Sequence, residues 1–218
     1  MRPYYEEDSI TIYHGDCREI LPTLPKVDLV LTDPPYGIAL ADMHFGKNSD
    51  ARRVSITGDE DMLAGGEVLD LVAGIPTIAF SSPSKPWGGA WSQFLVWDKV
   101  TGMGGDYRRE WMRSWELIQV RDLGVLNGDR DGAVLRYRLK EQETGIHPTR
   151  KPEALLRYLI GKTTKLRANV LDPFMGSGGT LAAAKNLGRR AIGIEIEERY
   201  CEIAAKRLAQ GVLPLEAA

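Results

Sequence analysis

Hydrophobic and polar residues follow each other along the chain in blocks that predict strands alternating with helices. Short, nearly all-apolar runs are typical of strands covered on both faces, and these runs are 10–13, 27–31, 77–80, 169–172 and 191–196. Runs with helical spacing or helix-ending signals lie between them, at 17–21, 67–73, 152–160, 178–187 and 198–210. This order predicts an α/β fold with a Rossmann-like, doubly wound and mostly parallel sheet.

The middle of the chain has a different pattern. Residues 38–61 are polar and contain glycine, which predicts a mobile loop, and 91–97 is one more strand candidate. Beyond a glycine cluster at 101–105, short alternating runs at 115–120 and 133–139 flank Asn127 and Gly128. An Asn-Gly pair between such runs is a hairpin signal, so we expect a small insertion over 101–146.

Composition restricts the class of protein. The 218 residues suit a single α/β domain, with 43% hydrophobic and 27% charged residues, and the net charge of −2 gives no global sign of nucleic-acid binding. Cys17 and Cys201 are predicted to be buried thiols, and three histidines make a metal site improbable. The first ten residues lack an apolar signal region, and no apolar run reaches the roughly 20 residues of a membrane span. We therefore expect a cytoplasmic protein without membrane association.

One strand candidate ends in a rigid turn. Residues 27–31 lead into Asp33, Pro34, Pro35 and Tyr36. Because proline fixes φ and lacks a backbone donor, this turn presents a carboxylate, a carbonyl and an aromatic ring in defined directions. Such a trio can bind a planar amino group, whereas the simpler interpretation is a proline-rich turn.

A second candidate site is the stretch LDPFMGSGGT, residues 171–180, where a strand candidate meets a helix candidate. Its glycines allow backbone amides to approach a ligand, and Asp172 is placed to hold a cationic amino group. Glu195 ends the next strand candidate, where nucleotide-binding sheets hold ribose hydroxyls. A tight turn and a solvated acid would explain either feature alone, but together they favour an adenosine-containing cofactor.

Four motifs together resemble those of the beta-class amino-group DNA methyltransferases. Residues 15–17 (GDC) resemble the N-terminal Gly-Asp element of that family, and 33–36 (DPPY) resemble its catalytic motif. Residues 147–152 (HPTRKP) resemble the segment before the cofactor loop, with Arg150 where Gln is usual. Residues 172–178 resemble the S-adenosylmethionine loop itself, followed by Gly179 where Thr is usual. The catalytic motif precedes the cofactor loop, which is the order of the beta class.

The resemblance implies a class I methyltransferase fold with S-adenosylmethionine as methyl donor, S-adenosylhomocysteine as product and no metal. It implies catalytic roles for Asp33, Pro34, Pro35 and Tyr36. The residues that it assigns to the cofactor are Asp16, Cys17, Asp33, His147, Thr149, Lys151, Asp172, Pro173, Phe174, Gly176, Ser177, Gly178, Thr180 and Glu195. Within this set, Asp16 is expected to reach the adenine and Glu195 the ribose, while His147, Thr149 and Lys151 are expected to close over the methionine end.

The implied reaction is methyl transfer to the exocyclic N6 amine of a flipped adenine in DNA. This amine is a weak nucleophile because its lone pair is delocalised into the ring. Asp33 and the Pro34 carbonyl can accept its two N–H groups and so free the lone pair, while Tyr36 stacks on the base. The sulfonium methyl is already activated, so positioning is the main catalytic requirement.

Double-stranded DNA is the expected partner. Candidate contacts are the arginines Arg52, Arg53, Arg108, Arg109, Arg113, Arg136 and Arg138. The expected organisation is a catalytic half at 1–100, a target-recognition insertion at 101–146 and a cofactor half at 147–218. A cognate restriction endonuclease and a homodimer stay open as further partners, in a prokaryotic or phage-encoded enzyme.

Other activities remain open at this point. Methylation of cytosine N4 is the first alternative, although its enzymes more often carry Ser where Asp33 stands. RNA and protein-glutamine methyltransferases usually place the cofactor loop first, so the motif order argues against them. An inactive nucleotide-binding remnant would not need the complete stretch from Asp33 to Tyr36.

Overall fold

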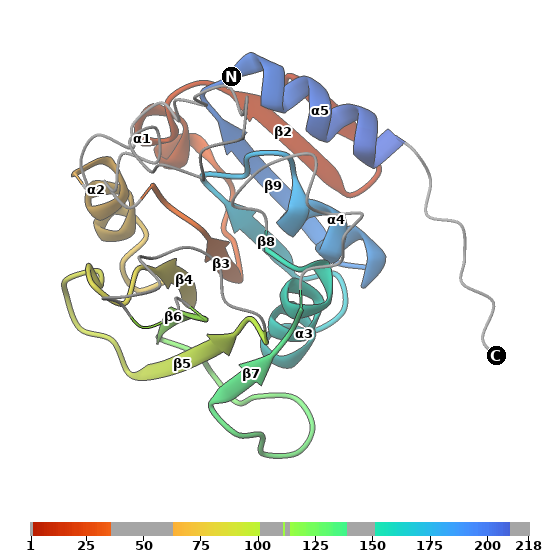
Figure 1. Cartoon of the computed structure of the whole chain (residues 1–218). Coiled ribbons are helices and arrows are strands. Elements are labelled where there is room, and N and C mark those ends of the chain that lie inside the picture. Colours follow the sequence, from red (N-terminus) through yellow and green to blue (C-terminus); the bar gives the residue numbers. More distant parts are fainter. Residues whose placement is uncertain (1, 36–62, 101–110, 112–113, 139–150, 210–218) are drawn as a thin grey trace, which may run out of the picture.

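The computed structural model describes residues 2–35, 63–100, 111, 114–138 and 151–209, and these form one mixed sheet with helices on both faces (Figure 1). Within these residues the sheet has nine strands in the order β1-β2-β9-β8-β3-β4-β6-β5-β7. The strands are β1 (Tyr5–Glu7), β2 (Ile10–His14), β3 (Leu29–Thr32), β4 (Thr77–Ser81), β5 (Gln93–Asp98), β6 (Trp115–Arg121), β7 (Val134–Arg136), β8 (Asn169–Asp172) and β9 (Arg190–Glu195). The predicted α/β class with a mostly parallel sheet is confirmed.

Five neighbouring strands, β2, β9, β8, β3 and β4, are parallel and form the middle of the sheet. Strands β3 and β8 are far apart in sequence but adjacent in space, with Val30 paired to Leu171. All four residues of β3 are buried, which explains its uninterrupted apolar sequence. Because parallel strands end at one edge, the residues that follow β3, β8, β9 and β2 meet there.

The helices bury the two faces of this sheet unequally. They are α1 (Cys17–Ile20), the 3₁₀ turn η1 (Leu21–Thr23), α2 (Leu63–Leu71), α3 (Glu153–Thr163), α4 (Gly179–Asn186) and α5 (Glu198–Ala209). Helices α3, α4 and α5 contribute to the larger hydrophobic cluster on one face, and α1, η1 and α2 to a smaller cluster on the other. Both cysteines are free and buried, as the sequence predicted. Each helix within the described ranges is too short or too polar to cross a bilayer.

The expected hairpin between 115–120 and 133–139 is wrong. Strand β6 pairs with β4 and β5, both antiparallel, while β7 pairs with β5 in parallel orientation. The connection between β6 and β7 is bound to the end of α3, where Asn127 Nδ2 donates to the carbonyls of Gly161 (2.9 Å) and Thr164 (2.8 Å). The Asn-Gly turn therefore anchors a longer loop to α3, and β6 is a strand of the main sheet.

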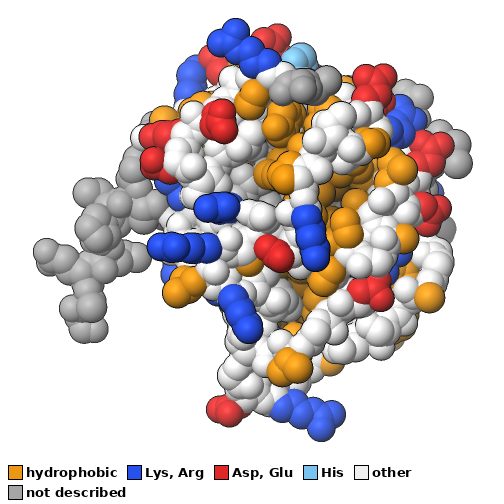
Figure 2. Space-filling model, turned by 180° about the vertical axis from the view of Figure 1, so that it is seen from behind, with side chains coloured by type: hydrophobic (Ala, Val, Ile, Leu, Met, Phe, Trp, Pro, Cys, Tyr) orange, Lys and Arg blue, Asp and Glu red, His pale blue; other side chains and the backbone are white. Residues whose placement is uncertain are grey.

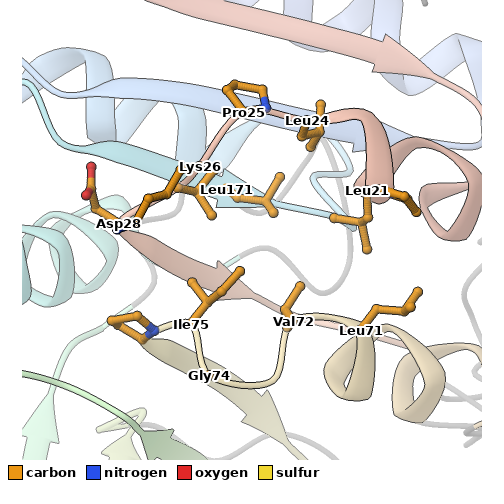
Figure 3. Close-up of a pocket in the computed structure, with 13 residues that line it drawn as sticks. Leu21, Leu24, Pro25, Lys26, Asp28, Leu71, Val72, Gly74, Ile75 and Leu171 are labelled. Atoms are coloured by element: carbon orange, nitrogen blue, oxygen red, sulfur yellow. The ribbon is translucent and has the colours of Figure 1, made fainter.

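A cavity of about 590 Å³ lies between η1 and the end of α2 (Figure 3). Its walls include Leu21, Leu24, Val72 and Ile75, and the chain segments just before β3 and β4. These segments lie at the amino ends of the parallel strands. The cavity is therefore at the opposite edge of the sheet from the residues that follow β3, β8, β9 and β2.

Candidate active site

The strand ends bring the predicted motifs together. Asp33 follows β3, Asp172 ends β8 and Glu195 ends β9, all at the carboxyl edge of the parallel strands. The Thr32 hydroxyl lies 3.0 Å from Asp172 Oδ1, which joins the first motif to the second directly. Gly15, next to Asp16, donates its backbone N–H to the Glu195 carbonyl at 3.0 Å. Residue 33 therefore lies beside the loop at 172–178, as methyl transfer between ligands of the two motifs would require.

The turn at residues 33–35 and a tryptophan both pack tightly around Gly65 of α2. Pro34 is buried, and a Cβ added at Gly65 of α2 would lie 3.0 Å from Pro34 Cβ and 2.6 Å from Trp87 Cη2. The Trp87 backbone exchanges hydrogen bonds with the buried Gln119 side chain, at 2.6 and 3.0 Å. Trp87 Nε1 also donates to the Phe80 carbonyl at 2.8 Å. This packing fixes where the Pro34 carbonyl lies, while Tyr36 is outside the described residues.

Asp33 is paired with a buried lysine. Lys151 Nζ lies 2.5 Å from Asp33 Oδ2 and 3.1 Å from Glu116 Oε2, and Lys99 Nζ lies 2.6 Å from the other oxygen of Glu116. Burial by itself would lower the pKa of Lys151, but the carboxylates of Asp33 and Glu116 raise it above its ordinary value. Lys151 therefore stays charged, and its ammonium holds Asp33 as an ordered carboxylate. The sequence assigned Lys151 to the methionine end of the cofactor, a role that remains a prediction.

Asp172 is a buried carboxyl group with raised pKa. Desolvation, with a smaller contribution from nearby Asp33, raises the pKa of Asp172 to about 7, against hydrogen bonds from Thr180, the Phe174 amide and Thr32 that lower it. The group is thus half-protonated near neutral pH in the free protein. A cation placed beside it would favour its ionised form, which fits the ammonium of a methionine moiety.

Glu195 connects the end of β9 to the glycine loop. Its Oε2 accepts from the Gly176 amide and its Oε1 from the Glu197 amide, each at 2.9 Å. Burial raises the pKa of Glu195, while these amide hydrogen bonds lower it. Each carboxylate oxygen can accept further hydrogen bonds, so ribose hydroxyls fit the same group.

Two glycines of the loop have left-handed backbone conformations, and one of them also allows close packing against α5. Gly176 and Gly178 have φ of 50° and 76°, and a Cβ at Gly178 would lie 2.9 Å from Ala204 Cβ. Pro173, Ser177 and Thr180 are buried and Phe174 is partly buried. These groups fit S-adenosylmethionine. A carboxyl group can accept from its ammonium, a carboxylate can accept from its ribose hydroxyls, and glycines lie beside both.

Asp16 and Cys17 lie at the start of α1. Asp16 caps this helix by accepting from the Arg18 amide at 2.9 Å, and the Arg18 guanidinium holds the pKa of Asp16 below its ordinary value. Burial raises the pKa of the Cys17 thiol to about 12, so this thiol is not ionised at neutral pH. The predicted approach of Asp16 to the cofactor adenine stays a prediction.

The remaining candidates divide into two groups. Arg136 ends β7 and Arg138 follows it; both are exposed at the carboxyl edge of the parallel strands, with Arg136 3.1 Å from Asp98. The other predicted residues lie outside the described residues, and these are Arg52, Arg53, Arg108, Arg109, Arg113, His147 and Thr149. Among the described residues, no group of three or more His, Cys, Asp or Glu side chains is arranged to hold a metal ion.

Sequence reasoning missed the residues that support Asp33 and Pro34. Glu116 and Gln119 belong to a short alternating strand without a motif, and Trp87 lies in a turn. The one signal in the sequence is that Glu116 and Gln119 are polar positions in a largely apolar strand.

Comparisons with known proteins identify the class of this fold and site. A family model described as DNA methylase matches residues 96–206, just over half of the chain. The type II methyltransferase M2.LlaDCHI of Lactococcus lactis subsp. cremoris is 27% identical, over 96% of this chain and 93% of its own. The crystal structure of the M1.HpyAVI–SAM complex is 31% identical with a TM-score of 0.66, covering 91% of this chain and 100% of that one. The PvuII cytosine-N4-specific methyltransferase, at 16% identity and a TM-score of 0.72 over 99% of this chain and 90% of that one, shares the fold.

The chain belongs to the DNA methylase family, whose members methylate an exocyclic amine, either N6 of adenine or N4 of cytosine. It is accordingly a DNA methyltransferase with S-adenosylmethionine as methyl donor. The family, the fold and the cofactor expected from the four motifs are confirmed.

We predict that Gly65→Ala lowers methyl transfer, because the new methyl group would displace Trp87 and Pro34. The turnover number should fall by about tenfold or more, since small misplacements near reacting groups are costly, with cofactor affinity little changed. Gly66→Ala is the matched control, since an added Cβ at Gly66 meets nothing within 4 Å. Equal turnover numbers for the two variants would contradict the supporting role of this packing.

Proposed function

We propose that this protein methylates the N6 amine of an adenine that has left the DNA duplex. The observation that carries this proposal is the junction of β3 and β8, where Thr32 connects the Asp33 turn to the Asp172 loop. A base bound at Asp33 and a cofactor bound at Asp172 would occupy neighbouring positions at one sheet edge. Methyl transfer between the two then needs no movement of the strands.

The chain's own residues act mainly by orientation. The Asp33 carboxylate accepts one N–H of the amine and the Pro34 carbonyl accepts the other, which frees the nitrogen lone pair. Bound S-adenosylmethionine supplies a methyl group already activated by its sulfonium. The nitrogen–methyl bond forms as the sulfur–methyl bond breaks, and Asp33 stabilises the positive charge that develops on the attacking nitrogen. The surplus proton of the methylated amine then leaves through Asp33 to solvent, because the charged Lys151 cannot accept it.

The proposed cofactor contacts follow the strand ends. Asp172 binds the ammonium of the methionine portion, Glu195 binds the ribose hydroxyls, and the amides of the loop at 174–178 line the ligand. The buried position of Asp172 and the amide hydrogen bonds of Glu195 support these roles, because both groups are already oriented. Asp16, Cys17, His147, Thr149 and Lys151 complete the proposed set.

DNA would approach the catalytic edge, where Arg136 and Arg138 are exposed. Elsewhere, on the face shown in Figure 2, basic and acidic side chains are interspersed and do not form one continuous basic patch. Local arginines, including those of the 101–146 segment, are therefore the proposed contacts. They would position the duplex and leave base readout to other groups.

The carboxylate of Asp33 supports adenine over cytosine as the target. Enzymes that methylate cytosine N4 more often carry Ser at this position. The ion pair with Lys151 keeps Asp33 in its acceptor form. Adenine N6 is accordingly the proposed target. Methylation of cytosine N4 would contradict this proposal.

The product identifies the base. We expect that incubation with labelled S-adenosylmethionine and DNA, followed by digestion to nucleosides, places the label in N6-methyladenine. Label in N4-methylcytosine alone would overturn the base assignment, and unlabelled DNA would overturn the activity.

Replacing Asp33 by Ala should lower the turnover number by on the order of 10² to 10³, because the amine loses its charged acceptor. Cofactor affinity measured by calorimetry should survive the change. A variant that loses cofactor binding but transfers methyl normally at saturation would contradict the assigned role.

Cofactor binding should depend on pH through Asp172. Because burial raises its pKa to about 7, the free protein keeps this proton below neutral pH, and a bound cation must displace it. The affinity for S-adenosylmethionine should therefore rise several-fold from pH 6 to about pH 7.5, and fall above about pH 8, where the cofactor's α-ammonium, with an ordinary pKa of about 7.7 to 8.0, loses its proton. Calorimetry with Asp172→Asn as control should show weaker binding without this rise; a wild-type affinity that is constant from pH 6 to about pH 7.5 would refute the contact.

A further inference from the structure

Glu116 is brought to the catalytic edge by an antiparallel strand. Since β6 runs opposite to β4, with Leu117 paired to Ser81, the first residues of β6 lie where the parallel strands end. The Glu116 side chain is only 17% exposed, and its two oxygens contact Lys99 at 2.6 Å and Lys151 at 3.1 Å. It forms the second contact of the lysine that holds Asp33.

Burial makes this arrangement sensitive to charge. The Lys151 side chain is 6% exposed, and its ammonium lies 5.0 Å from the centre of the Phe80 ring. A buried ammonium needs opposite charge close by to stay ionised, and Asp33 and Glu116 both provide it. Burial would raise the pKa of Glu116, but Lys151 and Lys99 lower it overall, so Glu116 is ionised as well.

We propose that Glu116 is a positioning residue for methyl transfer: it holds Lys151, and Lys151 in turn fixes the Asp33 carboxylate. This inference rests on the proposed role of Asp33 as acceptor of the target amine. Glu116 acts at a distance, through the chain of contacts from Lys99 to Glu116 to Lys151 to Asp33.

Two consequences follow for the reaction. Held at two points, the Lys151 ammonium has a fixed direction, and so has the Asp33 oxygen that it contacts. The negative charge of Glu116 also offsets the positive charge of Lys151, so Asp33 keeps its attraction for the positive charge developing on the amine. Without Glu116, a buried lysine would face Asp33 alone and would neutralise it.

The test is Glu116→Gln, which keeps the shape and removes the charge. We expect the turnover number to fall by about 10- to 100-fold, a larger change than that in the dissociation constant for S-adenosylmethionine, to which Lys151 would contribute only one of several contacts. Loss of Glu116 also lowers the pKa of Lys151, so the variant should lose the ordered Asp33 carboxylate, and with it activity, at lower pH than the wild type does on the alkaline side of the pH profile. An ion pair with only a structural role would not move this alkaline limb.

Asp131→Asn is the matched control, because it removes a carboxylate that contacts Lys162 at 2.7 Å in the last turn of α3, at the other end of the helix from Lys151. Its turnover number and pH profile should equal those of the wild type. A Glu116→Gln variant with wild-type turnover and pH profile would refute the inference while leaving the proposed function intact. Unmethylated DNA with the wild-type enzyme would instead refute the proposed function.

A double-mutant cycle tests the route through Lys151 even where Glu116→Gln alone folds poorly. The double variant Glu116→Gln/Lys151→Gln removes the two most buried charges together and leaves only the more exposed Lys99 and Asp33. If Glu116 acts through Lys151, the double variant should transfer methyl as well as Lys151→Gln alone. A further drop in turnover in the double variant would show a separate role for Glu116 and overturn the inference.

Discussion

Two carboxyl groups, Asp33 and Asp172, lie at the ends of neighbouring parallel strands, and the site depends on keeping both there. Burial, with a smaller contribution from Asp33, raises the pKa of Asp172 to about 7. Lys151 compensates Asp33 from the other side, at 2.5 Å. The free protein therefore holds one ordered carboxylate and one carboxyl group that a cationic ligand would ionise. That asymmetry suits a base on one strand end and a sulfonium cofactor on the next.

One antiparallel strand supports both sides of the catalytic turn. On β6, Gln119 holds the backbone of Trp87 near Pro34, while Glu116 holds Lys151 beside Asp33. These residues are three positions apart, so they point to opposite faces of the strand. The strand expected to belong to an insertion is thus part of the framework of the site. The 101–146 segment as the DNA-recognition region stays a prediction.

Much of the fold and of the candidate site could be predicted from the sequence, because apolar runs and glycine loops are local signals. The runs at 27–31 and 169–172 identified β3 and β8, and the two Asp-Pro motifs identified the strand ends. The pairing of β6 with β4 was not accessible, since strand partners depend on contacts far apart in sequence. Nor was the Lys151–Glu116 contact, because it joins residues from a strand and a helix entry without a shared motif. The three-residue strand β1 is too short and polar to have been predicted.

A ternary structure with DNA and a non-reactive cofactor analogue tests the central claim most directly. The measured quantities are the distances from the target amine to the Asp33 carboxylate and the Pro34 carbonyl. Hydrogen-bond distances of roughly 3 Å to both, with the amine facing the transferable group of an analogue held at Asp172, are the result that the account predicts. An amine bound away from Asp33, or an analogue held elsewhere than beside Asp172, would contradict it.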